Sequence, residues 1–450
     1  MKHSKSTRVR FATALSALAT VCSAAPAIAQ QSLSDVLQKT YVTNPTLQAQ
    51  RASQRAVSEQ KAQAWAQALP QITAGGAYQK TDGSQSINAA VFGGVGVVDN
   101  EFNITTLSGQ VNGELVLFNG LRNVNTIKQA AARIRAGGAE LAAVEQDILA
   151  QTASAYFDVV RDAEVYAANL NNVKVLARQK EQADLRFEVG EVTRTDVAQA
   201  DARLAGARAQ LTSAQAQLAI SRARFAQLTG EAPGTLDKSP AMPETPASIL
   251  DAQALARQYA PTVIAAKAQE VASRKNIAIA KSAFAPQISL SSTYRYADEP
   301  SVSVLDSEEF VYGLTASVPI FQGGLNLSRV KEARALNDAD RRRVEESERR
   351  AETAVASAWE QLFAANSNIR SAEAQREANT LALEGVRREA EFGTRTTLDV
   401  LNAEQELLNS AVAVANAQRD ARVATFTLLA NIGLLTPAAL GFDDAHSPQE

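Results

Sequence analysis

The chain has 450 residues, with 45 lysines and arginines against 48 aspartates and glutamates, so its formal net charge at pH 7 is −3. One cysteine and two histidines exclude a cysteine or histidine metal cluster and leave little material for a catalytic triad. No basic block suits nucleic acid, and nothing places two carboxylates in one cleft. We therefore predict no enzyme activity, no metal or cofactor and no nucleic-acid partner.

The first 29 residues have the organisation of an export signal. Four basic residues precede an apolar stretch at residues 11–21, and Ala27-Ile28-Ala29 provides the small residues of a cleavage site. We predict a signal peptide over residues 1–29 and a mature start near Gln30. Removing it leaves 41 of the 45 basic residues against all 48 acidic ones, a net charge of about −7.

A first repeat follows, which we place at residues 30–230. After a helical start it contains two segments of alternating polarity, at about residues 70–80 and 106–118, with a loop expected over Thr81–Asn100. No run after the signal approaches the ~18 apolar residues of a membrane-spanning helix. The alternating segments have the length of outer-membrane strands, at about ten residues. Any membrane crossing must therefore use strands.

Long helices follow these strands. No proline occurs between Pro70 and Pro233, and the composition favours helix. We predict a helix over Leu121–Phe187, about 100 Å long, with a weak point at Gly137-Gly138. It ends at a turn formed by Gly190, and a second helix runs back over Asp196–Leu228. The result is an antiparallel hairpin.

The same pattern recurs after a linker at residues 231–250. Residues 118–230 match residues 321–433 at a constant offset of 203, and we place the second repeat at 251–433, with a polar tail at 434–450. Its strands are expected at about 286–296 and 309–320, with a loop over Ala297–Ser307 between them. Its helices are expected over Leu325–Phe392 and Asp399–Asn431, with the turn at Gly393.

Aromatic residues are expected in two interfacial girdles of the strands. The members are Tyr78, Phe102, Tyr294, Tyr296, Phe310 and Tyr312 at one end, and Phe118 and Phe321 at the other. The alternative is a pair of soluble β-hairpins packed on helices. That arrangement would not explain the alternating pattern, because it offers no core large enough to need one apolar face on every strand.

Four strands do not close a barrel, and lipid does not accept a sheet edge with unpaired backbone groups. We therefore expect the chain to associate with copies of itself. The pattern alone allows two, three or four copies.

The two hairpin tips, residues 186–197 and 392–403, resemble those of the TolC family of outer-membrane channels, and the resemblance extends over residues 33–440. It implies a mainly α-helical fold with a membrane β-barrel portion, built from two tandem repeats. Each repeat is a β-hairpin plus a long antiparallel helical hairpin. It also implies a homotrimer with a twelve-stranded barrel in the outer membrane and a twelve-helix tunnel that extends into the periplasm. The implied function is a passive exit duct for efflux or type I secretion. The implied partners are outer-membrane lipid, a periplasmic adaptor and an inner-membrane pump or ABC transporter.

The resemblance also implies roles for residues at the tips. The expected gate residues are Thr195, Asp196, Arg395 and Asp399, and the expected adaptor-contact turns contain Val189, Gly190, Gly393 and Thr394. Arg395 is expected to pair with Asp196 or Thr195 of a neighbouring helix pair. Asp399, repeated around a three-fold axis, would form an acidic ring whose members raise one another's pKa. Asn402 and Ala390 depart from the family pattern and weaken the case for tight closure.

Simpler interpretations stand beside these. Thr195, Asp196, Thr397 and Asp399 can be helix caps alone. Tyr156 and Trp359 are expected to be packing residues, and residues 338–352 a solvated charged helix face. As competing functions we keep an outer-membrane-anchored coiled-coil stalk without a lumen and a periplasmic adaptor.

Overall fold

The computed structural model describes residues 31–88, 95–301 and 304–441. The predicted signal peptide and the end of the tail lie outside these ranges. The elements, in chain order, are α1 (Leu33–Thr43), α2 (Pro45–Ala66), β1 (Gln71–Asn88), β2 (Val97–Asn119), α3 (Arg122–Glu188), α4 (Arg194–Thr229), α5 (Ile249–Tyr259), α6 (Pro261–Ser282), β3 (Gln287–Ser301), β4 (Val304–Ser317), α7 (Leu325–Glu391), α8 (Thr397–Ile432) and η2 (Ala438–Leu440). Among the described residues, no helix is long and apolar enough to cross a membrane.

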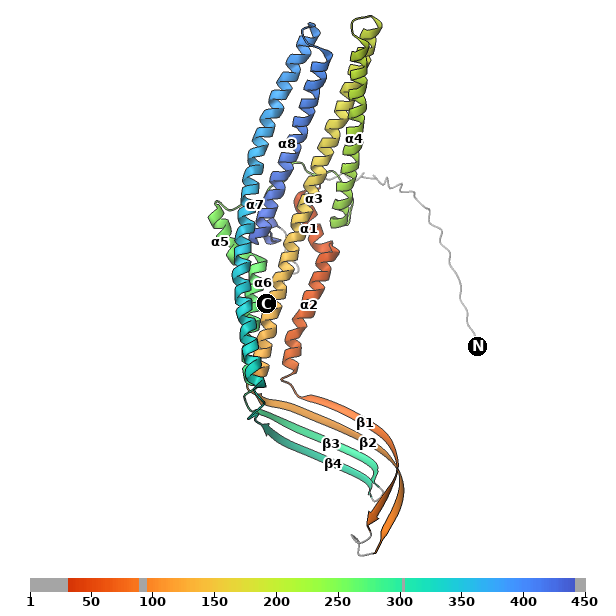
Figure 1. The fold of residues 1–450 in the computed structure, drawn as a ribbon, viewed down its shortest axis with the longest axis vertical. Coiled ribbons are helices and arrows are strands. Elements are labelled where there is room, and N and C mark those ends of the chain that lie inside the picture. Colours follow the sequence, from red (N-terminus) through yellow and green to blue (C-terminus); the bar gives the residue numbers. More distant parts are fainter. Residues whose placement is uncertain (1–30, 89–94, 302–303, 442–450) are drawn as a thin grey trace, which may run out of the picture.

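The molecule is elongated, with a sheet at one end and two helical hairpin tips at the other (Figure 1). Each repeat contributes two strands and one long hairpin, α3/α4 or α7/α8, and the long helices α3 and α7 have 67 residues each. The strands form one antiparallel sheet in the order β1-β2-β3-β4. Because β1 and β4 are the outer strands, each has one edge without a partner among the residues that the structure describes.

The register sorts the side chains into two faces. Val111 lies opposite Tyr294, which lies opposite Phe310, so these three share a face. Their neighbours two residues along each strand are mostly apolar or small, and the residues between them are mostly polar. The apolar face carries Ile72, Ala74, Gly76, Tyr78, Leu107, Gly109, Val111, Leu115, Ile288, Leu290, Tyr294, Tyr296, Phe310, Tyr312 and Leu314. The predicted alternation is therefore confirmed.

Phe102 does not belong to the aromatic girdle. It pairs with Gly83, which puts it on the opposite face from Tyr78. A Cβ at Gly83 would lie 2.7 Å from the Phe102 ring, so the ring covers the glycine. The other tyrosines and phenylalanine expected at this end, on β1, β3 and β4, share the apolar face.

The strands are longer than predicted, and the two predicted loops were wrong in extent. β1 and β2 have 18 and 23 residues, so pairing continues through most of Thr81–Asn100. β3 and β4 likewise extend into Ala297–Ser307, but β4 ends at Ser317, three residues before the predicted end at 320. The reason is that backbone pairing does not require alternating polarity, so polar residues beyond the apolar segment continue the ladder.

The long helices pack side by side in one layer. Towards the tips the order is α4-α3-α8-α7, and towards the sheet it is α2-α3-α6-α7. A weak point was predicted at Gly137-Gly138, but α3 continues through both glycines without interruption. A Cβ at Gly137 would lie 2.3 Å from Gln54 Oε1 of α2, so this glycine permits close helix packing instead.

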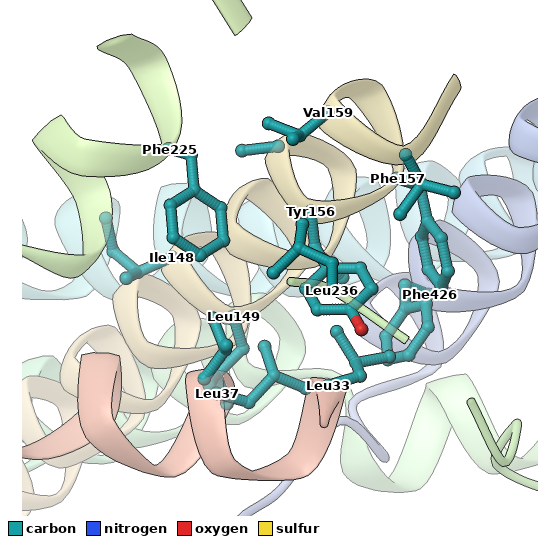
Figure 2. Packing of buried hydrophobic residues seen from close by; sticks show 14 of the residues in the cluster. Leu33, Leu37, Ile148, Leu149, Tyr156, Phe157, Val159, Phe225, Leu236 and Phe426 are labelled. Carbon is teal, nitrogen blue, oxygen red and sulfur yellow. The ribbon is translucent and has the colours of Figure 1, made fainter. Parts of the chain in front are cut away.

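The largest core lies midway along the helices, where α1 and the linker cover α3 (Figure 2). Tyr156 is fully buried there, and its single hydroxyl proton is shared between the Gln31 carbonyl oxygen at 3.0 Å and the Asp237 carbonyl oxygen at 2.8 Å. Burial raises its pKa to about 12. A second core joins α5 to α7 and α8, with Trp359 packed against it. Both residues therefore pack as expected, and Tyr156 also binds two backbone segments.

The predicted polar tail begins too early. Leu434 donates its N–H to the Leu429 carbonyl at 2.9 Å, and Leu435 is only 1% exposed. Both leucines pack against the core that contains Tyr156. The turn after α8 therefore brings two apolar side chains back into the protein, and the packed structure continues beyond residue 433.

Candidate functional site

The two hairpin tips are built by the same turn. At the end of α3, Gly190 N–H donates to the Phe187 carbonyl (3.0 Å) and Glu191 N–H to the Arg186 carbonyl (2.8 Å). At the end of α7, Gly393 and Thr394 make the equivalent bonds to Ala390 and Glu389, at 3.1 and 3.0 Å. This is the Schellman arrangement, which requires a residue with positive φ. The φ angles of Gly190 and Gly393 are 79° and 75°, in the left-handed region that glycine adopts without strain.

A capping box starts each returning helix. Thr193 is the N-cap of α4, and its N–H donates to Asp196 Oδ2 at 2.9 Å while Asp196 N–H donates to Thr193 Oγ1 at 3.3 Å. Thr396 and Asp399 repeat this geometry at the start of α8, at 3.0 and 3.2 Å. The cap is therefore Thr193 or Thr396, not Thr195 or Thr397, and each aspartate is the third helical residue of the box.

Hydrogen bonds from the cap threonines lower the pKa of both Asp196 and Asp399. Within one chain, the effect on Asp399 is opposite to that expected from a ring of like charges. Any such ring would first have to overcome the stabilisation of the carboxylate by its own helix start. Asp399 is half-exposed, and Thr195 is exposed in the first turn of α4.

Arg395 pairs within its own hairpin. Its Nε donates to Glu389 Oε2 at 2.8 Å, and this carboxylate raises the arginine's pKa. Arg395 is exposed, so its other donors remain available at the tip. The expected bond to Asp196 or Thr195 concerns a neighbouring helix pair and stays a prediction.

The tips expose apolar side chains as well as charges. Val189 is 71% exposed at the first tip, and Phe392, which occupies the equivalent position at the second tip, is 84% exposed. Phe187, two residues before Val189, is 45% exposed. Gly190, Gly393 and Thr394 are also exposed. Both tips therefore present an apolar side chain beside an exposed turn.

Behind the tips, two polar contacts join the hairpins of one chain. Arg203 Nη2 of α4 donates to Asn402 Oδ1 of α8 at 2.8 Å. Glu404 of α8 is 7% exposed, pairs with Arg387 of α7 and accepts from Gln179 Nε2 of α3 at 3.4 Å. We call these five residues the inter-hairpin latch. Beside it, a small apolar cluster packs α3 and α4 onto Leu401 of α8.

Asn402 therefore has a specific partner. A carboxylate at this position would also accept from Arg203, whereas the asparagine does so without adding a negative charge. Ala390, the second departure from the family pattern, lines a cleft of about 380 Å³ between the hairpins. A larger side chain there would fill part of this cleft.

Four residues of the latch were not predicted from the sequence: Arg203, Gln179, Arg387 and Glu404. The internal repeat contains a clue to this ion pair. At the offset of 203, Arg387 and Glu404 correspond to Asp184 and Asp201, which are both acidic, so only the second repeat can form the pair. A position where two copies differ in charge is a candidate for a contact made by only one copy.

Comparisons with known proteins agree with this geometry. Residues 36–231 and 253–434 match the family model described as "Outer membrane efflux protein". The outer membrane efflux protein BepC of Brucella suis biovar 1 is 30% identical over 423 residues, which cover 93% of this chain and 89% of that protein. The outer membrane protein TolC of Vibrio cholerae serotype O1 is 26% identical over 324 residues, 69% of this chain and 73% of that protein.

A solved structure supports the fold independently. The CmeC outer membrane channel of Campylobacter jejuni superposes with a TM-score of 0.77 at 17% identity. The match covers 93% of this chain and 88% of that one. The two-repeat arrangement of strands and long helical hairpins is therefore shared with a channel of distant sequence.

Proposed function

The chain belongs to the outer membrane efflux protein family, and from that membership we propose that it is the exit duct of a tripartite efflux or type I secretion system. It is an outer-membrane protein that extends into the periplasm and serves as an efflux channel. The proposed duct is passive, and the periplasmic hairpin tips are its gate. The observation that carries the proposal is the amphipathic sheet with two open edges, continued by a wall of long helices.

We propose a homotrimer with a twelve-stranded barrel and a twelve-helix tunnel. The open edges of β1 and β4 support it, because pairing with neighbouring copies satisfies backbone groups that lipid would leave unpaired. The outermost helices support it too. α7 exposes Phe363 at 65%, and α4 at the opposite edge exposes Ile220 at 61%. Both are large apolar side chains that another copy would cover.

We propose the following division of the chain. Residues 1–29 are the signal peptide, 30–230 and 251–433 the two repeats, 231–250 the equatorial linker, and the last residues a polar tail. The separation of the two family-matched segments, 36–231 and 253–434, supports the position of the linker.

The proposed gate closes when the tips of neighbouring hairpins meet and opens when α7/α8 moves away from α3/α4. Two bonds of the inter-hairpin latch, Arg203 to Asn402 and Gln179 to Glu404, oppose that movement within each chain. The exposed turns at Val189, Gly190, Gly393 and Thr394 are the proposed contacts for a periplasmic adaptor, with an inner-membrane pump or ABC transporter behind it. BepC, an efflux protein by name, favours efflux over protein secretion.

Two measurements test the proposal. An electron-microscopy map of the purified oligomer is expected to show three copies around a continuous lumen. Planar bilayers are expected to show low conductance that rises when the latch is removed. A stalk without a lumen would show no conductance in either form, and that outcome would overturn the proposed function.

A further inference from the structure

The helix ends that meet the sheet are strongly basic, although the mature chain is acidic. We consider the eleven residues nearest the sheet in each of the four helices α2, α3, α6 and α7. Together these segments contain nine basic side chains and two acidic ones, Glu59 and Glu332. We call the nine the basic collar. Its members are Lys61, Arg122, Lys128, Arg274, Lys275, Lys281, Arg329, Lys331 and Arg334. Nine against two gives a local charge of +7 within about 16 Å of helix.

The collar is neither buried nor neutralised. Eight of the nine side chains belong to exposed residues, and Lys275 is half-buried. Within the described part of the chain only Arg274 has an ion pair, with Glu270 at 3.9 Å. Farther along α7 the charged stretch differs, because Arg342 and Arg350 pair with Glu345 and Glu346. That stretch is a self-compensated solvated face, as predicted, whereas the collar retains its charge.

Each collar helix also presents an apolar side chain closer to the sheet than a basic one, three or four residues apart. On α2, α3 and α7 this spacing puts both side chains on the same helix face. The pairs are Trp65 with Lys61 on α2, Val124 with Lys128 on α3, Phe284 (just beyond α6) with Lys281, and Leu325 with Arg329 on α7. The apolar members are 53%, 44%, 51% and 48% exposed. An apolar group beside the membrane and a cation farther out is the arrangement of side chains at a membrane interface.

The collar lies where the lipid headgroups would be. The helices continue from the sheet (Figure 1), whose apolar face is the proposed lipid contact. The headgroup layer is about 5–7 Å thick, so Lys281 and Arg329 near the helix ends can reach it directly. The other cations start at most about 14 Å along their helices from the sheet end. They therefore lie within about 10 Å, the screening length at moderate salt, of the far side of that layer.

We propose that the basic collar binds the anionic phospholipid headgroups of the periplasmic leaflet. The inference rests on the proposed membrane position of the sheet. A second copy of the chain is a less suitable occupant. In the proposed oligomer the open edges α2 and α7 would bring Lys61 towards Arg329 and Lys331, and like charges repel. Phosphate groups of lipid instead supply the missing negative charge.

Quenching of Trp65 by brominated lipids tests the proposal. The chain has two tryptophans, so Trp359→Phe in the full-length oligomer leaves Trp65 as the only reporter. Brominated phosphatidylglycerol and brominated phosphatidylcholine are compared at equal mole fraction. We expect at least a fivefold preference of the collar for phosphatidylglycerol. The combined change Lys61→Gln, Lys281→Gln and Arg329→Gln is expected to remove it.

A matched variant removes three exposed cations far from the sheet: Lys174→Gln, Arg370→Gln and Arg376→Gln. It is expected to keep the preference, as is exchange of the collar residues between lysine and arginine. Equal quenching by both lipids, no quenching by either, or a preference that survives the collar variant would each overturn the proposal. So would loss of the preference in millimolar inorganic phosphate, which would identify a site for the free anion. Bilayer conductance separates the two proposals: a conducting channel without lipid preference refutes only the collar, and a non-conducting one refutes the proposed function.

Discussion

Tyr156 joins three parts of the chain that are far apart in the sequence. Its ring lies in the core under α1, and its hydroxyl reaches Gln31, just after the predicted signal peptide, and the linker at Asp237. Gln31 and Leu236 also pair as a short parallel bridge. A single hydroxyl group thus helps to hold the connection between the repeats against the wall of long helices.

We predict that Tyr156→Phe loosens the linker without changing the core. The Asp237 carbonyl loses its donor, at a cost of about 1–2 kcal/mol. Hydrogen exchange in residues 231–248 is expected to become roughly tenfold faster. Tyr166→Phe is the control, because Tyr166 is a half-buried packing residue without a hydroxyl bond among the described contacts. Equal exchange in wild-type and Tyr156→Phe protein would refute the role of the hydroxyl.

The aspartates of the two capping boxes predict a pH dependence of the tips. Because the folded pKa of Asp399 is lowered below its ordinary 3.8, its contribution to stability is present above that value. It is lost as the pH falls through the lower folded pKa. We expect the first turn of α8 to fray only in that acidic range, measured by hydrogen exchange corrected for the intrinsic rate.

The control for this prediction is Asp399→Asn, which has no carboxylate to titrate. In that variant the exchange of the first turn is expected to be insensitive to pH across the same range. Thr396→Ala is expected to give roughly fivefold faster exchange even at neutral pH, because it removes the cap itself. Fraying of the wild-type tip already at pH 6 would contradict the account.

At the scale of elements, helix ends were predictable because they depend on local chemistry. Gly190 and Gly393 end the helices since only a residue with positive φ closes the Schellman turn, and the observed ends lie within three residues of the predicted ones. Strand ends were less predictable. Beyond Lys80 the side chains give no alternation, yet the backbone ladder continues to Asn88.

The candidate site was predictable only in part, for a related reason. Asp196 and Asp399 could be read from the tips, although their immediate partners in the capping boxes, Thr193 and Thr396, were missed. Arg203 and Glu404 required knowledge of which helices are adjacent. That α8 lies beside α3, and so also meets α4, follows from packing over the whole layer and not from any local pattern.

We predict that breaking the latch favours the open tip. Arg203→Met removes the bond between α4 and α8, which is worth about 1 kcal/mol, so the ratio of open to closed channels should rise about fivefold per bond. Single-channel conductance in planar bilayers measures this. In cells, the variant should admit more of a large antibiotic that the intact outer membrane excludes.

The matched control is Arg208→Met, an exposed arginine on the same helix without a side-chain bond among the described contacts. It is expected to conduct like the wild type. Arg395→Ser should act independently, because Arg395 bonds Glu389 within its own hairpin and any role in closure lies between neighbours. If Arg203→Met and Arg208→Met behave alike, the contact with Asn402 does not hold the tip.

At the scale of the whole molecule, the internal repeat gives two similar halves that serve different positions in the layer. α3 lies in the interior of the layer, between α4 and α8, whereas its counterpart α7 lies at an edge. Their buried faces differ accordingly: α3 buries a run of large side chains around Tyr156 and Phe157, and the buried residues of α7 are fewer and mostly small. The exposed face of α7 is therefore the part of the chain that most needs a neighbour.

That face yields a prediction about assembly. Leu327, Phe363 and Leu381 are 54%, 65% and 72% exposed and are separated by 36 and 18 residues, whole numbers of helical turns, so they share one face of α7. Because burying a large apolar side chain is worth about 1.5–3 kcal/mol, Phe363→Asp should weaken the proposed trimer by at least tenfold in its dissociation constant. Analytical ultracentrifugation in detergent measures it. Leu250→Asp on α5 is the control, because Leu250 is 73% exposed yet lies on neither edge helix. A Phe363→Asp protein that remains as trimeric as the Leu250→Asp protein would show that this face of α7 is not where the copies meet.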